Sequence, residues 1–334
     1  MLRELGFVLC IASAVSVSAC GSSSPSSPTS PASTSTGSAG STTTTSTTTS
    51  TAPPTTGPTT RAWTNVAYAT ASSANRLDLY LPADGNGPFP TVVFIHGGGF
   101  SGGSRSQGLS TAQYLVTRGY AVATIDYRLS GEAKFPAQIH DVNAAIRYLK
   151  ANASTYFLRA DRFATWGESA GAGLAALAGT SGGVFELEDL SMGSAGADSR
   201  VQAVVDLFGP INFLTMNSEW KLLGVTNGQD HDAANSPESQ LIGAPIQTRP
   251  DLCTLYNPET YISTDDPPFI VQHGSADVLI PYLQGKNFAD KLASALGPAQ
   301  VTWMLMDGAG HGGSAFSSSG NLSLLASFLD RSLK

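Results

Sequence analysis

The chain has 334 residues and a formal net charge of −7. A nucleic-acid partner would require a basic face, so this charge balance argues against one. Of three cysteines only Cys253 lies beyond the first 20 residues, so no disulfide is expected within the folded body.

Residues 1–19 have the pattern of a secretory signal peptide. Arg3 precedes a mostly apolar stretch, residues 5–17, that is too short to span a membrane. The sequence Val17-Ser-Ala-Cys20 is similar to a bacterial lipobox, in which the cysteine is lipidated after cleavage before it. Cleavage by the ordinary signal peptidase would also suit it. We expect export and favour lipidation of Cys20, which would make the protein a cell-surface or periplasmic lipoprotein; otherwise it is secreted.

Residues 20–60 differ in composition from the rest of the chain. Positions 21–60 contain only Gly, Ser, Pro, Thr and Ala. Such a segment cannot bury enough apolar surface to offset the entropy lost on ordering. We therefore predict a disordered tether at residues 20–60, whose Ser/Thr tract could carry O-glycans, followed by one domain at residues 61–334.

Strands alternate with helices along residues 61–334. Two alternating segments, residues 65–69 and 77–81, predict an antiparallel pair. The further predicted strands are residues 91–95, 121–125, 163–166, 201–207, 269–273 and 301–306, and the predicted helices are residues 107–118, 136–150, 170–178, 282–296 and 321–331. This order predicts an α/β fold, a mostly parallel sheet covered on both faces. Catalytic groups should then collect at the carboxyl ends of the strands.

Residues 210–262 interrupt this alternation of strands and helices. The segment is long, contains Asn, Asp, Pro and Gly clusters, and carries Phe213, Trp220 and Tyr256. An insertion of this size usually forms a cap or a substrate wall, so we predict a cap-like insertion here. A loosely packed surface excursion is the alternative.

The segment around Ser169 predicts a nucleophile elbow. A β-prone run at residues 163–166 leads into Gly167-Glu-Ser-Ala-Gly171, and good helix formers follow. A serine in this strained strand-to-helix turn needs near-absent side chains two positions before and after it. Two other serines fit the same pattern, but Ser181 follows a helical run and is expected at its C-cap. Ser101 is followed by further glycines that disfavour a helix, so Ser169 is the candidate nucleophile.

A serine nucleophile needs a histidine as general base, and the chain has five. His311 lies in a glycine-rich loop after the last predicted strand, so its ring can approach a neighbouring strand end, and we predict it as the base. His140 falls within a predicted helix, as a packing or surface residue. His273 is expected to support a turn, and His96 opens a glycine-rich loop. His231, between two aspartates, is expected in a solvated loop, with only a weak indication of metal binding.

An acid must orient the imidazole of the base. Asp277 lies just past the strand at residues 269–273 and opens toward the same edge of the sheet, so we favour it. Asp307 is the rival, because it lies closer to His311 in sequence. The order Ser169, Asp277, His311 is that of the α/β-hydrolases, unlike the order in chymotrypsin or subtilisin.

The loop His96-Gly-Gly-Gly-Phe100 follows a predicted buried strand. Acyl transfer develops negative charge on the carbonyl oxygen, and fixed backbone N–H groups stabilise it. Glycines let this loop approach closely, and the N–H of Ala170 should complete the oxyanion hole. A phosphate-binding loop is the alternative, but no Gly-Lys-Ser/Thr follows and the dinucleotide spacing is absent.

Together these motifs resemble the esterase/lipase α/β-hydrolases, in particular the branch near hormone-sensitive-lipase-like enzymes that includes bifunctional feruloyl and acetyl-xylan esterases. The motifs are His96-Gly-Gly-Gly-Phe100, Asp126-Tyr-Arg128 with Phe135-Pro136 and Asp141, Gly167-Glu-Ser-Ala-Gly171, Pro267-Pro-Phe269 with His273-Gly-Ser-Ala-Asp277, and Gly308-Ala-Gly-His311-Gly. The resemblance implies that Gly98 and Gly99 donate to the oxyanion. Gly171-Ala-Gly173 departs from the two adjacent glycines of many relatives, and the insertion is the part that transfers least.

We therefore expect an exported serine carboxylesterase of the α/β-hydrolase fold. The resemblance and the tether suggest acetyl or feruloyl esters as substrates, on small molecules or plant polysaccharide. A lipase, a general small-ester hydrolase, an amidase or peptidase of the same fold, and a non-catalytic binding module are the alternatives. The motifs imply no metal and no cofactor, and we expect contact with a membrane only through a lipid on Cys20.

Overall fold

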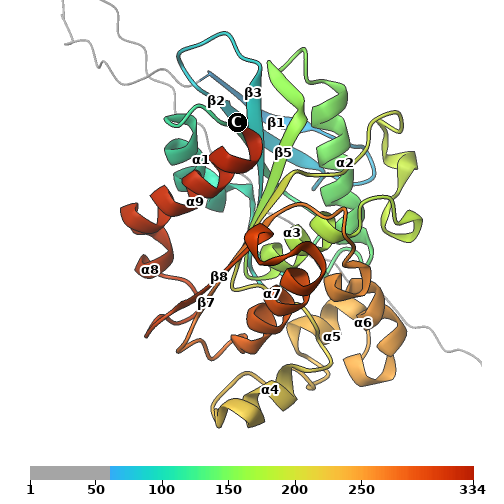
Figure 1. Cartoon of the computed structure of the whole chain (residues 1–334). Coiled ribbons are helices and arrows are strands. Elements are labelled where there is room, and N and C mark those ends of the chain that lie inside the picture. Colours follow the sequence, from blue (N-terminus) through green and yellow to red (C-terminus); the bar gives the residue numbers. More distant parts are fainter. Residues whose placement is uncertain (1–60) are drawn as a thin grey trace, which may run out of the picture. The chain divides into compact units, whose positions relative to one another are not determined.

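The computed structural model describes residues 61–334, which contain one eight-stranded sheet (Figure 1). The strands are β1 (Arg61–Ala67), β2 (Arg76–Leu81), β3 (Phe89–Ile95), β4 (Ala121–Ile125), β5 (Leu158–Glu168), β6 (Ala203–Leu207), β7 (Phe269–Gly274) and β8 (Val301–Met306). Their order across the sheet is β1-β2-β4-β3-β5-β6-β7-β8. The first three strands of this order pair antiparallel, and β4, β3 and β5 to β8 run parallel.

Helices cover both faces of the sheet. They are α1 (Leu109–Val116), α2 (Ala137–Ala151), α3 (Ala170–Thr180), α4 (Met216–Leu223), α5 (Pro237–Ile242), α6 (Pro250–Tyr256), α7 (Leu283–Leu296), α8 (Ser314–Ser317) and α9 (Ser319–Leu333). Figure 1 shows α1 and α9 on one side of the sheet and α2, α3 and α7 on the other.

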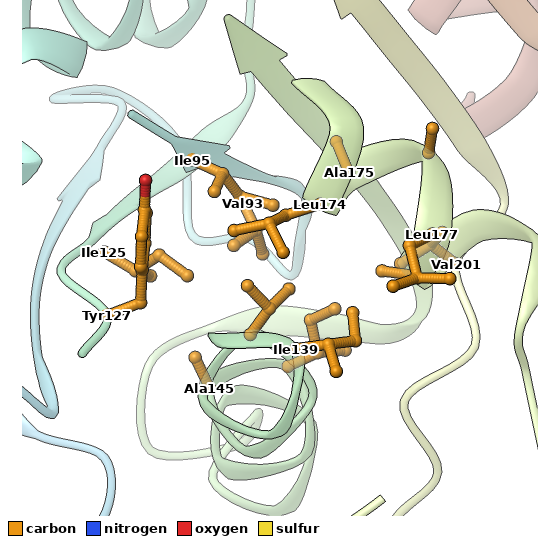
Figure 2. Packing of buried hydrophobic residues seen from close by; sticks show 14 of the residues in the cluster. Val93, Ile95, Ile125, Tyr127, Ile139, Ala145, Leu174, Ala175, Leu177 and Val201 are labelled. Atoms are coloured by element: carbon orange, nitrogen blue, oxygen red, sulfur yellow. The ribbon is translucent and has the colours of Figure 1, made fainter. Parts of the chain in front are cut away.

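Successive side chains of the central strands enter different cores because a strand turns them to opposite faces. On β3, Val92 and Phe94 pack with α1 and α9, whereas Val93 and Ile95 pack with α2 and α3. Figure 2 shows the second core, where Leu174 lies against Ile95 and Val93. Burial on both faces accounts for the continuous apolar runs in the sequence.

The predicted mostly parallel α/β fold is confirmed, with local shifts of element bounds. The first strand spans Arg61–Ala67 and not residues 65–69, and it contains a bulge at which Asn65 adopts a φ of 57°. The helix predicted at residues 107–118 begins only at Leu109, after a 3₁₀ turn at Arg105–Gly108. Gly108 packs so closely against Phe94 that a Cβ there would overlap its ring, and glycine weakens a helix.

The insertion at residues 210–262 contains α4, α5 and α6, and its Phe213, Trp220 and Tyr256 side chains are buried. Phe213 and Tyr256 stack with ring centroids 4.0 Å apart, and Tyr256 also meets the edge of Phe100. Gln284 of α7 accepts hydrogen bonds from the backbone of Ile211 and Asn212 through its side chain, at 2.8 and 2.7 Å. These contacts attach the insertion to the body of the domain.

The predicted signal peptide, Cys20 and the tether lie outside the described residues. Within residues 61–334 we find no helix that combines the length and apolarity of a membrane span.

Candidate active site

Ser169 stands alone between the end of β5 and the start of α3, with φ 53° and ψ −125°. A non-glycine residue in this region is strained, so the surrounding backbone must hold it there. The two flanking glycines make this packing possible. A Cβ at Gly167 would overlap the carbonyl of Gly171, and one at Gly171 would overlap the carbonyl of Ile95. The turn predicted at Ser169 is therefore present in the structure.

A chain of hydrogen bonds joins Ser169 to His311 and His311 to Asp277. The distance between Ser169 Oγ and His311 Nε2 is 2.7 Å, and that between His311 Nδ1 and Asp277 Oδ2 is also 2.7 Å. The three residues follow β5, β8 and β7, whose carboxyl ends share one edge of the sheet. The Phe208 ring meets the edge of the imidazole, with centroids 4.8 Å apart. This arrangement matches the geometry that a serine nucleophile, its base and an orienting acid require.

The carboxylate of Asp277 is held by more than His311. Its Oδ1 accepts the backbone N–H groups of Leu279 and Ile280, at 2.8 and 3.0 Å. The His273 Nε2–H lies 3.2 Å from Oδ2 and also donates to the Ile280 carbonyl. Burial alone would raise the pKa of Asp277, but hydrogen bonds from His273 and His311 outweigh it and lower the pKa. The acid is therefore ionised at neutral pH, and His273 supports the turn as predicted.

The glycine loop after β3 turns its backbone toward Ser169. Gly98 and Gly99 have φ values of 115° and 58°, and a Cβ at Gly98 would overlap the Gly102 carbonyl. The N–H groups of Gly98, Gly99 and Ala170 donate to no other group within the described residues. Three free N–H groups beside one serine are what an oxyanion hole needs.

His96, at the start of this loop, is held in place by Tyr127. Its ring stacks on Tyr127 with centroids 4.4 Å apart, and the Tyr127 hydroxyl donates to the His96 carbonyl at 3.0 Å. Burial lowers the pKa of His96, so the ring is neutral at physiological pH. Sequence reasoning did not assign this role to Tyr127.

The reacting groups open into a cavity of about 440 Å³. It is lined by Gly98, Gly99, Phe100, Ser101, Ser169, Ala170, Pro210, Gln229, Pro237, Glu238, Leu279, Ile280 and His311. Pro210, Gln229, Pro237 and Glu238 come from the insertion, which therefore forms part of the cavity wall.

A family model described as BD-FAE matches residues 77–292, more than half of the chain. The chain belongs to the BD-FAE family. It has the α/β-hydrolase fold of the solved structures that it resembles.

Relatives of this BD-FAE chain are named as esterases. It is 30% identical over 227 residues to esterase LipC of Mycobacterium tuberculosis, covering 67% of this chain and 53% of LipC. The chain thus spans about half the length of the curated relatives it matches. A truncated carbohydrate esterase from gut microbiota is 30% identical, with a TM-score of 0.73 over 81% of this chain and 96% of that one. A bifunctional GH43-CE protein of Bacteroides eggerthii is 35% identical, with a TM-score of 0.73 over 82% and 35% of the respective chains.

The other candidate residues of the BD-FAE chain do not bond to the Ser169, His311 and Asp277 side chains. Asp307 is exposed and accepts a hydrogen bond from Ser275 at 3.3 Å, and it does not contact His311. Ser181 is the C-cap of α3, as predicted. Ser101 lines the cavity but bonds to no histidine within the described residues. His140 is half-buried and bonds to the Glu186 carbonyl at 3.2 Å.

The prediction of a solvated loop at His231 is wrong. The ring is fully buried, stacks near Trp220 with centroids 6.4 Å apart, and bonds Glu238 Oε2 through Nδ1 at 3.0 Å. Asn217 holds it by accepting the backbone N–H of His231 at 2.9 Å. The flanking aspartates are surface residues, and within residues 61–334 no group of side chains could hold a metal ion. Glu238 had no signal in the sequence beyond its place in the insertion.

Proposed function

We propose that this protein is an exported serine carboxylesterase that cleaves short acyl esters through a Ser-His-Asp acyl-enzyme mechanism. One observation carries the proposal. The hydrogen-bond chain that joins Asp277, His311 and Ser169 opens at Ser169 into a cavity where three backbone N–H groups have no partner within residues 61–334. The esterase names of its relatives agree with this chemistry.

In the first half-reaction Ser169 Oγ attacks the ester carbonyl carbon, and its proton moves to His311 Nε2. Asp277 accepts the Nδ1–H and stabilises the imidazolium. The N–H groups of Gly98, Gly99 and Ala170 bind the negative oxygen of the tetrahedral intermediate. The bond to the alcohol oxygen then breaks, and that oxygen takes the proton from His311 Nε2. The product is an acyl-enzyme on Ser169 and a free alcohol.

The second half-reaction repeats these steps with water as the nucleophile. Water gives a proton to His311, attacks the acyl carbon, and the same N–H groups bind the oxyanion. Ser169 leaves and regains its proton from His311. The net reaction is an ester and water giving a carboxylic acid and an alcohol, with no other reactant.

Two features support a short acyl group on a carbohydrate. A cavity of about 440 Å³ lies at the small end of ligand sites and suits an acetyl group with part of its alcohol. The two solved relatives quoted above include one titled carbohydrate esterase. Feruloyl esters need more room and would have to extend through the open side of the cavity.

The proposal of export rests on the first 60 residues. The apolar stretch before Cys20 and the Ser/Thr/Pro-rich segment after it support a lipid-anchored or secreted domain on a tether.

A substrate panel tests this function. We would measure kcat/KM for chromogenic acetyl, butyryl, long-acyl and feruloyl esters and an acetyl anilide, with Ser169→Ala as the control. The proposal expects acetyl or feruloyl esters to be cleaved fastest. A preference for long acyl chains would identify a lipase. Similar kcat/KM values for all esters would identify a general esterase, and faster cleavage of the anilide would identify an amidase. If no substrate is turned over, the alternative of a non-catalytic binding module would be supported.

A further inference from the structure

A carboxylate of the insertion lies in the wall of the substrate cavity. The proposed reaction does not use this carboxylate. Glu238 lines the cavity, and its residue is only 1% exposed. His231 occupies Oε2, whereas Oε1 makes no hydrogen bond within the described residues. A carboxylate oxygen that has no protein partner and belongs to a residue lining a cavity can accept a hydrogen bond from a ligand there. We propose that Glu238, with Gln229, forms a subsite for a free hydroxyl group on the alcohol part of the ester.

The surroundings of His231 indicate which of its ring nitrogens donates to Glu238. His231 Nε2 is buried and has no hydrogen-bond partner within the described residues. A proton there would be a buried donor without an acceptor, which is unfavourable. The ring therefore carries its proton on Nδ1 and donates it to Glu238. The Oε1 of Glu238 is then left to accept a hydrogen bond from the substrate.

Local structure fixes Glu238 beside the oxyanion loop. Pro237 opens α5, and the Ser236 side chain caps this helix by accepting the Ser239 N–H at 3.0 Å. Pro237 also packs on Gly99, since a Cβ at Gly99 would lie 3.4 Å from the Pro237 Cβ. The carboxylate is thus held on a short rigid element next to the position of the ester carbonyl.

The chemistry of the wall favours a hydroxyl group over a cation. The Gln229 side chain also lines the cavity, makes no hydrogen bond within the described residues, and offers both a donor and an acceptor. A hydroxyl group can donate to Glu238 and accept from Gln229 at once. Sites for organic cations are usually walled by several aromatic faces. Among the residues that line this cavity, only Phe100 is aromatic apart from the His311 ring.

This inference rests on the proposed esterase function, and it specifies which alcohol part of the ester the site prefers. Its test needs no polysaccharide. We would compare kcat/KM for glyceryl 1-acetate, which carries free hydroxyl groups, with that for propyl acetate, which carries none. The ratio of the two values measures the hydroxyl subsite and cancels any general loss of esterase activity.

Glu238→Gln should lower this ratio about tenfold, because a charge-assisted hydrogen bond becomes a neutral one. Glutamine still offers an acceptor to His231, so folding should survive, which the melting temperature would check. Gln229→Ala, at a half-buried position, should also lower the ratio and decides the matter if Glu238→Gln does not fold. Glu186→Gln, at an exposed site outside the cavity lining, is the matched control and should leave the ratio unchanged.

An unchanged ratio in Glu238→Gln, or in Gln229→Ala if only that variant folds, would overturn the subsite. A larger loss of acetylcholine cleavage than of glyceryl acetate cleavage would overturn it too, since the carboxylate would then bind a cation. Failure of the wild type to deacetylate xylan, with the ratio behaving as expected, would overturn only the polysaccharide part of the proposed function.

Discussion

Replacing Asp277 by asparagine tests the proposed acid most sharply, because the structure determines which way the new amide must point. Two backbone N–H groups, from Leu279 and Ile280, donate to Oδ1. The amide oxygen of the asparagine must occupy that position. Its NH₂ group then replaces Oδ2, which faces His311 Nδ1 at 2.7 Å and the His273 Nε2–H at 3.2 Å.

A donor at that position inverts the hydrogen-bond pattern around the base. His311 would have to accept through Nδ1 and carry its proton on Nε2, where it can no longer take the proton of Ser169. Loss of the correct tautomer in a serine triad lowers kcat about 10⁴-fold. At about 1.4 kcal/mol for each factor of ten, the transition state is destabilised by about 5.5 kcal/mol.

The assay is kcat for a chromogenic acetyl ester at neutral pH, with the melting temperature as a check on folding. Asp307→Asn is the matched control, because Asp307 is exposed and bonds only to Ser275 among the described residues. It should retain activity within about a factor of two, since an exposed substitution of this kind rarely perturbs a site. A folded Asp277→Asn variant that keeps a tenth of wild-type kcat would refute the reasoning. So would a larger loss in Asp307→Asn.

Three further predictions follow from single residues. Ser169→Ala should lower kcat by about 10⁴-fold or more with the fold intact, whereas Ser101→Ala should stay active; the reverse result in the same ester assay would identify the other serine as the nucleophile. Cys20→Ser should release the protein from the membrane fraction, and unchanged association would exclude lipidation as the anchor. Burial raises the pKa of Asp206 to about 7. Between about pH 4 and pH 7 the carboxyl group is therefore protonated in the folded state and ionised in the unfolded state. The free energy of unfolding falls progressively over this range, by up to about 4 kcal/mol. Asp206→Asn should remove this loss, so its stability relative to wild type should rise from pH 4 to pH 7 in urea titrations; a constant difference would contradict the shift.

The parts of the site that could be predicted from the sequence all follow strands of the parallel part of the sheet. Each of Ser169, Asp277 and His311 comes a few residues after a continuous apolar run. Parallel strands end at a common edge, so residues that are far apart in the chain meet there without any knowledge of their contacts. The glycines around Ser169 add a second, local signal, because only a crowded backbone turn requires them.

The pair of His231 and Glu238 carries no such signal, because its burial depends on contacts between distant segments. Gln284, on a helix more than 50 residues further along the chain, accepts the backbone N–H groups that open the insertion and donates to Glu219 at 2.7 Å. α5 itself lies beside the oxyanion loop, where Pro237 is next to Gly99. Strand-end motifs therefore predict the proposed chemistry, whereas the proposed alcohol subsite consists of residues whose positions depend on tertiary contacts. Relatives that share the motifs around Ser169 but differ in the insertion should have the same chemistry and different substrates.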